Sequence, residues 1–186
     1  MSMIGYGRES ICLHRDVQVV RIPDGTPDQL PKGHIVTLSQ SLGGNFTVID
    51  ETGHMVRIAG EDADALGKEP PILSNMKSGT DAQTIEANVW EALRTIFDPE
   101  IPVNIVELGL IYHCTVNPVS AEQSDVRVIM TLTAPGCGMG PVLQLDAEAA
   151  IRAIPGVGKV AVEVVFDPPW SRDRMSEAAL LQLGMI

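Results

Sequence analysis

Residues 126–154, VRVIMTLTAPGCGMGPVLQLDAEAAIRAI, decide the fold of the second half of the chain. A strand over 126–133 would carry one apolar face, because large apolar side chains recur there at every second position. These side chains belong to Val126, Val128, Met130 and Leu132. Pro141 then stands at the start of a helix over 141–154, and proline is favoured in the first helical turn. The stretch predicts a strand, a glycine-rich loop and a helix.

Further elements lie on both sides of this stretch. On the N-terminal side, apolar residues recur at helical spacing in DAQTIEANVWEALRTIF, namely Ile85, Val89, Leu93 and Ile96 with Phe97. Thr80 or Asp81 would cap this helix, and Asp98-Pro99 would end it because proline disfavours a helical residue before it. Strands are predicted over 110–117 and 159–166, and a short closing helix over 176–186. In the strand over 159–166, one face would carry Val160, Val162, Val164 and Phe166.

The predicted order α-β-β-α-β-α indicates an α+β domain, a small mixed sheet with helices packed on it. We expect this domain to span residues 81–186. Residues 1–66 contain short β-type runs separated by turn residues, which favours a small N-terminal all-β module. Residues 67–80, GKEPPILSNMKSGT, have two prolines, two glycines and little periodicity, and are expected to form a linker.

Charge and composition exclude several classes of protein. The formal net charge is −11 over 186 residues, with five basic and nine acidic residues in 1–66 and eight and fifteen in 67–186. Neither half is basic, so no nucleic acid or anionic membrane is expected as a partner. No apolar run reaches about 18 residues, and the start lacks a signal-peptide pattern, which together favour a cytoplasmic protein. The three cysteines are widely spaced, so reduced thiols are expected rather than a disulfide framework.

Cys137 lies in an unusual context, TAPGCGMGP, directly before the predicted helix. The start of a helix presents unpaired N–H groups and the positive end of its dipole, so we expect the pKa of this thiol to fall. The neighbours Pro135, Gly136, Gly138 and Gly140 would hold the thiol in a loop that another molecule can approach closely. The sequence therefore predicts an accessible, activated thiol. Cys12 and Cys114 are expected to be packing residues.

Several familiar sites are absent from the sequence around this thiol. No Gly-Lys-Ser/Thr follows the loop, no second cysteine stands at CxxC spacing, and no complete zinc site is present. A Cys-His hydrolase would need a histidine brought close in space. The candidates are His14, His34, His54 and His113, and none is favoured by its sequence position.

Two further segments are candidates for a site. FDPEIPVNIVELGLIY contains Asp98 and Glu100 on either side of a proline, either as an acidic patch or with Asp98 capping a turn. FDPPWSRDRMS contains Asp167 and Trp170 in a stiff turn, either as a partner surface or with the indole covering the edge of the core. Both alternatives remain open for both segments.

DPEIPVNIVELGLIY, MTLTAPGCGMG and DPPWSRDRMSEAALLQLGM together resemble the iron–sulfur cluster assembly domain family. That family includes SufT, PaaD and the eukaryotic cytosolic iron–sulfur targeting subunit. The similar region covers about 84–186, and the N-terminal β module resembles the extension of the SufT subgroup. One departure is that Gly138 stands where many relatives have a proline, which should make the loop more flexible.

The resemblance implies an auxiliary factor in iron–sulfur protein maturation rather than a turnover enzyme. The family's reactive cysteine falls on Cys137, and its acidic motif falls on Asp98 and Glu100. The implied partners are iron–sulfur carrier, scaffold and client apo-proteins. No tightly bound cofactor is implied, and Cys137 would be a shared ligand for transient iron or a transient cluster, held with a second copy or a partner. The alternatives are a non-catalytic adaptor in which Cys137 is dispensable and a thiol enzyme of unknown substrate.

Overall fold

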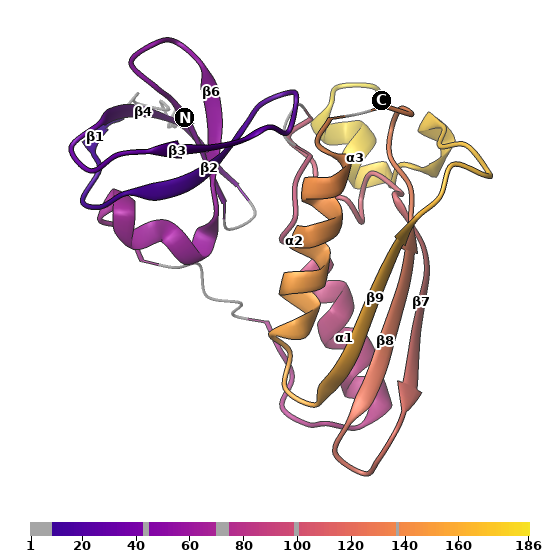
Figure 1. The fold of residues 1–186 in the computed structure, drawn as a ribbon. Coiled ribbons are helices and arrows are strands. Elements are labelled where there is room, and N and C mark those ends of the chain that lie inside the picture. The colour runs from indigo at the N-terminus through magenta and orange to yellow at the C-terminus, as the bar shows by residue number, and fades with distance from the viewer. Residues whose placement is uncertain (1–8, 43–44, 70–74, 99–100, 137) are drawn as a thin grey trace, which may run out of the picture. The chain divides into compact units, whose positions relative to one another are not determined.

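The computed structural model describes residues 9–42, 45–69, 75–98, 101–136 and 138–186 (Figure 1). Its contacts divide the chain into two compact units, Met1–Ile72 and Leu73–Ile186. No helix in the described ranges is long and apolar enough to cross a membrane. Each unit has its own hydrophobic core.

The second unit contains the predicted helices and strands in the predicted order, which confirms the α+β fold class. They are α1 (Ala82–Leu93), β7 (Ile111–Pro118), β8 (Ser124–Met130), α2 (Gly140–Arg152), β9 (Val157–Val164) and α3 (Glu177–Gln182). A short 3-10 turn, η2 (Arg172–Arg174), precedes α3. The sheet order is β7-β8-β9. β8 pairs antiparallel with β7 and parallel with β9, because α2 carries the chain back to the starting end of the sheet.

The core of this unit lies between the sheet and the helices α1 and α2. Val126, Val128 and Met130 on β8 are buried, as their alternation predicted. α1 lies against β7, and α2 lies against β9 (Figure 1). On β9 the strand ends at Val164, so Phe166 is not a strand residue and is 45% exposed.

Helix α1 begins as predicted but ends earlier. The Asp81 carboxylate accepts hydrogen bonds from the Thr84 N–H at 3.0 Å and the Thr84 hydroxyl at 2.6 Å, which identifies Asp81 as the cap. The hydrogen bond from the Thr84 hydroxyl is the main reason that the Asp81 pKa lies below its ordinary value. The helix ends at Leu93, four residues before the predicted end, because Phe97 instead forms an isolated β-bridge with Asn104.

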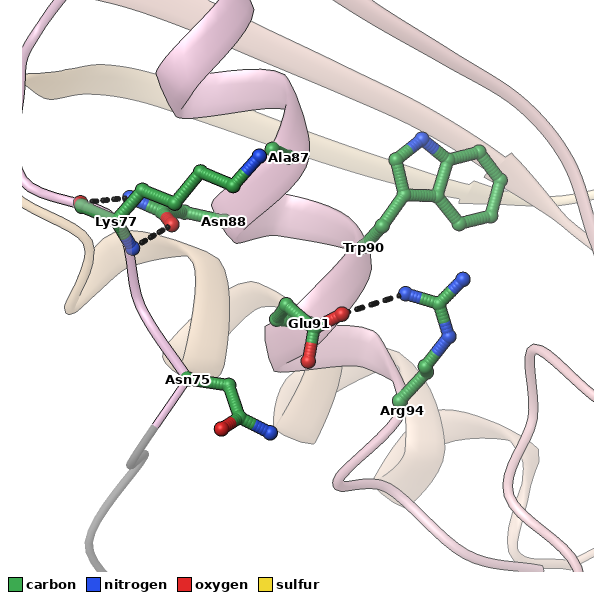
Figure 2. A pocket seen from close by; sticks show the side chains of 7 residues that line it. All are labelled: Asn75, Lys77, Ala87, Asn88, Trp90, Glu91 and Arg94. Carbon is green, nitrogen blue, oxygen red and sulfur yellow. Dashed lines mark hydrogen bonds and ion pairs between the residues drawn. The ribbon is translucent and has the colours of Figure 1, made fainter.

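Part of the predicted linker packs against the second unit. The buried Asn88 side chain on α1 accepts from the Lys77 N–H at 2.8 Å and donates to the Lys77 carbonyl at 2.9 Å (Figure 2). The side chain of Met76 packs against the core of the same unit. These contacts attach the chain to α1 several residues before the helix begins.

The first unit is an antiparallel sheet of six strands in the order β1-β4-β5-β6-β2-β3. The strands are β1 (Glu9–Cys12), β2 (Val17–Arg21), β3 (Pro27–Leu30), β4 (Ile35–Leu42), β5 (Asn45–Ile49) and β6 (Met55–Ile58). The all-β character is as predicted. β3 lies within PDGTPDQLPKG, residues 23–33, which are rich in turn-forming types, and it is a strand because it pairs with β2, Val17 opposite Leu30. A 3-10 segment, η1 (Gly60–Leu66), closes the unit and contributes to its core.

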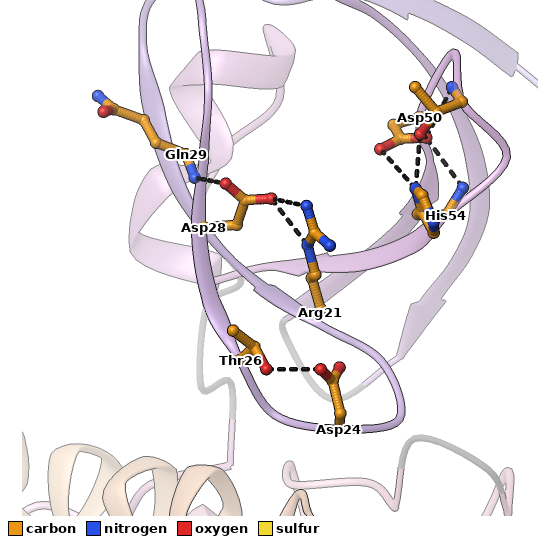
Figure 3. A network of polar contacts seen from close by, with 8 residues as sticks. Arg21, Asp24, Thr26, Asp28, Gln29, Asp50 and His54 are labelled. Carbon is orange, nitrogen blue, oxygen red and sulfur yellow. Dashed lines mark hydrogen bonds and ion pairs between the residues drawn. The ribbon is translucent and has the colours of Figure 1, made fainter.

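Aspartates of this unit accept hydrogen bonds within a strand pair and within a turn (Figure 3). The Asp28 carboxylate accepts from the Gln29 N–H and from Arg21, both at 2.8 Å, and these bonds lower its pKa. The Asp50 carboxylate accepts from the His54 N–H at 2.9 Å, closing the turn between β5 and β6. Asp50 therefore serves a local turn, which is a usual role of aspartate, whereas Asp28 on β3 binds Arg21 at the end of β2.

Candidate functional site

The loop between β8 and α2 has an exposed apex and a buried base. Pro135 and Gly136 are exposed, Gly138 is half-buried, and Gly140 is buried. Gly136 has a φ of +79°, in the left-handed region that favours glycine. At Gly140 a Cβ would stand 2.5 Å from Leu132 Cδ1, so this glycine allows close packing instead. Cys137 lies outside the described residues.

Helix α2 begins directly after this loop. Its N-cap is Met139, which has a buried side chain and makes no side-chain capping hydrogen bond. A proline occupies the first turn, at Pro141, as predicted. The first turn of a helix carries N–H groups without intrahelical acceptors and a partial positive charge. An anionic group next to the loop would therefore meet a favourable potential.

The acidic segment is used partly for local structure. The Asp98 side chain is only 7% exposed, and its carboxylate accepts from the Ile101 N–H at 3.1 Å. The Asp98 N–H donates to the Val103 carbonyl at 3.3 Å. This geometry agrees with the alternative in which Asp98 caps a turn. Glu100 lies outside the described residues.

Residues 168–176, which we call the strap, fasten the segment that follows the acidic turn. The Trp170 indole N–H donates to the Leu108 carbonyl at 2.7 Å, and the Tyr112 hydroxyl donates to the Pro168 carbonyl at 2.7 Å. The Arg174 guanidinium lies over the Tyr112 ring, 4.4 Å from its centroid. Trp170 is half-buried against the core, which agrees with the alternative in which its indole covers the edge of the core. Asp167 is exposed.

The three segments that carry the resemblance meet at the end of β8. The Thr131 N–H donates to the Leu110 carbonyl at 2.8 Å, which joins the start of the cysteine loop to the end of the acidic segment. The Val165 N–H donates to the Met130 carbonyl at 2.8 Å, which joins the same point to the chain leading into the strap. The sequence could not show this convergence, because the segments are separated by a strand and a helix.

The other two cysteines have different environments. Cys12 is exposed in the first unit, with its Sγ 3.6 Å from the Gly33 carbonyl oxygen. Cys114 is half-buried on β7, where desolvation, with a smaller contribution from Glu86, raises the pKa of its thiol to about 11. Within the described ranges, no three His, Cys, Asp or Glu residues are grouped so that they could hold a metal ion.

We expect Cys114 to alkylate slowly in the folded protein. Its rate with iodoacetamide should keep rising to about pH 11 instead of levelling near the ordinary thiol pKa of about 8.5, because only the thiolate reacts. Mass spectrometry of the labelled peptide would give the rate, and the same cysteine in the urea-unfolded chain is the control. A plateau near pH 8.5 in the folded chain would show that the desolvation is absent.

Comparison with known proteins identifies the class of protein. A family described as iron–sulfur cluster assembly protein matches residues 86–164. A Fe–S protein maturation auxiliary factor of Porphyromonas gingivalis is 41% identical over 101 residues, which are 54% of this chain and 92% of that protein. The maturation auxiliary factor SufT of Staphylococcus aureus is 37% identical over 90 residues, 48% of this chain and 98% of that protein.

A solved structure shares the fold of the same part of the chain. A domain of unknown function from Bacillus anthracis is 34% identical, with a TM-score of 0.51, and covers 56% of this chain and 96% of that one. This chain belongs to the iron–sulfur cluster assembly protein family, as its three motifs predicted. Within the family, its similarity to the S. aureus protein confirms the resemblance to the SufT type.

Proposed function

We propose that the chain is an auxiliary factor in iron–sulfur protein maturation, which assists cluster assembly or delivery to client apo-proteins through Cys137. The convergence of the three segments at the end of β8 supports this function most directly. It joins the cysteine loop to the acidic segment through a backbone hydrogen bond. The names of the P. gingivalis and S. aureus relatives support the same class of function.

The thiol inventory limits what this chain can do alone. An iron–sulfur cluster takes four protein ligands as a rule. The first unit has one cysteine, Cys12, and the second has two, Cys114 and Cys137. Cys114 is half-buried on a strand with a raised pKa, so it is a poor ligand. A cluster or iron held at Cys137 is therefore cargo, with its remaining ligands supplied by a carrier, scaffold or client protein, or by a second copy of this chain. Holding it only transiently suits delivery.

A second candidate function is that of an adaptor without cargo. A thiol enzyme has less support, because His113 is exposed on β7 and the other three histidines belong to the first unit. Such an enzyme would need a general base beside its thiol.

Deletion of the gene tests the proposed function. We expect the activities of cluster-dependent enzymes to fall in the deletion strain, while the activity of enzymes without clusters stays unchanged. Expression of the full chain should restore them. Iron content and activity of one purified client would be measured in each strain. Normal client activity in the deletion strain would contradict any role in maturation under the growth conditions used.

A further inference from the structure

Helix α1 has two apolar features, of which only one is used by the core. Its buried stripe faces the sheet and consists of Ile85, Val89, Ala92 and Leu93. Trp90 lies off this stripe, is half-buried, and does not belong to the core cluster of the unit. The same outer face carries Ala87, three residues before Trp90, and Arg94, four residues after it. Glu91 follows Trp90 directly and lies four residues after Ala87. A large aromatic side chain on the outer face of a helix needs a separate explanation.

A cavity of about 400 Å³ lies beside this outer face. Its lining residues are Asn75, Lys77, Ala87, Asn88, Trp90, Glu91 and Arg94 (Figure 2). One wall is the segment before α1, which Asn88 holds in place through both backbone groups of Lys77. We call this cavity the Trp90 pocket.

Two polar groups at the Trp90 pocket have no partner in the described part of the chain. They are the Lys77 ammonium and the Trp90 indole N–H, both of which are donors. Arg94 is already paired with Glu91 at 2.9 Å and lies 4.0 Å from Glu107. Because Arg94 and Glu91 offset each other, the exposed Lys77 gives the pocket a net positive charge in a chain whose formal net charge is −11. Neither donor is a buried group without a partner, so water can bond to both, and a carboxylate that enters the pocket would take the place of that water.

We propose that the Trp90 pocket binds an acidic segment of a partner protein, in which a carboxylate neighbours an apolar side chain. The carboxylate would accept from Lys77 and from the indole N–H, and the apolar side chain would lie on the ring. Tryptophan and arginine are the residue types most often found where protein contacts are strongest. The proposal rests on the proposed function for the existence of protein partners.

Peptide titration tests the Trp90 pocket directly. The probe is a short peptide of alternating Glu and Leu without tryptophan, and its control has Lys in place of every Glu. The acidic peptide should change the tryptophan emission of the full chain saturably, and more weakly as ionic strength rises. Trp170 serves as a fixed background because its indole N–H is bonded to Leu108. A Trp90→Phe substitution should remove the change in emission.

Charge reversal provides the matched comparison. Lys77→Glu should weaken binding of the acidic peptide by about tenfold or more, whereas Lys159→Glu, at an exposed lysine of β9, should leave it within about twofold. Circular dichroism of each variant checks that it is folded. No saturable binding of the acidic peptide, equal binding of the basic peptide, or equal affinities of the two lysine variants would each overturn the proposal.

Failure of this inference can be told apart from failure of the proposed function. The titration contains no iron, cluster or client, so its result does not depend on maturation activity. A deletion strain with normal client enzymes would refute the maturation role even if the peptide bound. Suppose that the clients are inactive in the deletion strain. If the wild-type chain and the double variant Lys77→Glu/Trp90→Ala then restore client activity equally, only the proposal for the Trp90 pocket is overturned.

Discussion

A Cys137→Ser chain is expected to leave client enzymes as inactive as they are in the deletion strain. Serine keeps the size of the side chain but supplies no thiolate, which is the form of cysteine that binds iron and clusters. The loop offers no second cysteine to take over this role. Client activity and client iron content would be measured in the deletion strain complemented by the variant, at equal expression.

Cys114→Ser is the matched control for this substitution. It removes a thiol from the same unit, but from a half-buried position with a raised pKa, so client activity should be retained. If Cys137→Ser also restored full activity, the adaptor function would replace the thiol function. The acidic segment would then be tested with Glu100→Gln, because Asp98 is buried and its loss would also disturb the turn to Ile101.

Gly109→Ala is expected to be the most damaging single substitution for the stability of the second unit. Gly109 has a φ of +74°, and a Cβ there would stand 2.1 Å from the Arg174 carbonyl oxygen. The obstacle is backbone, so it can only be avoided by displacing the strap. That displacement would strain the bonds from Trp170 to Leu108 and from Ser176 to Glu107. We expect a loss of about 4 kcal/mol in the free energy of unfolding.

Urea unfolding followed by tryptophan fluorescence would measure this loss, since both tryptophans lie in the second unit. Gly184→Ala is the control: its φ is +67°, but a Cβ there has no other atom within 4 Å. It should cost only the backbone penalty, about 1 kcal/mol. Equal losses for the two variants would mean that the strap does not press against Gly109. A stable but strap-displaced variant would show a shifted Trp170 emission.

Local patterns were sufficient for much of the second unit. The alternation of Val126, Val128 and Met130 predicted the buried face of β8, and Pro141 predicted the first turn of α2. These features depend on residues close in sequence, so periodicity and backbone preference determine them. The family resemblance rested on long contiguous motifs and could also be recognised without a structure.

Other elements are decided by distant partners and not by local pattern. β3 lies in a turn-rich stretch and is a strand through its pairing with β2. α1 ends at Leu93 although its periodicity continues to Phe97, because Phe97 pairs with Asn104 across a turn. In both cases hydrogen bonds to another segment outweigh local preference, and no pattern within the segment records them.

The sequence by itself determined the fold class, the order of helices and strands, and the candidate thiol at Cys137. Only the tertiary structure decided which groups are buried, paired or left without a partner. It buried Asp98, joined the indole N–H of Trp170 to the carbonyl of Leu108 by a hydrogen bond, and placed Lys77 and the half-buried Trp90 in the lining of one pocket. The physical reason is the separation along the chain over which each effect acts. Periodicity depends on residues close in sequence, whereas burial and hydrogen bonding depend on which distant segments the tertiary fold brings into contact.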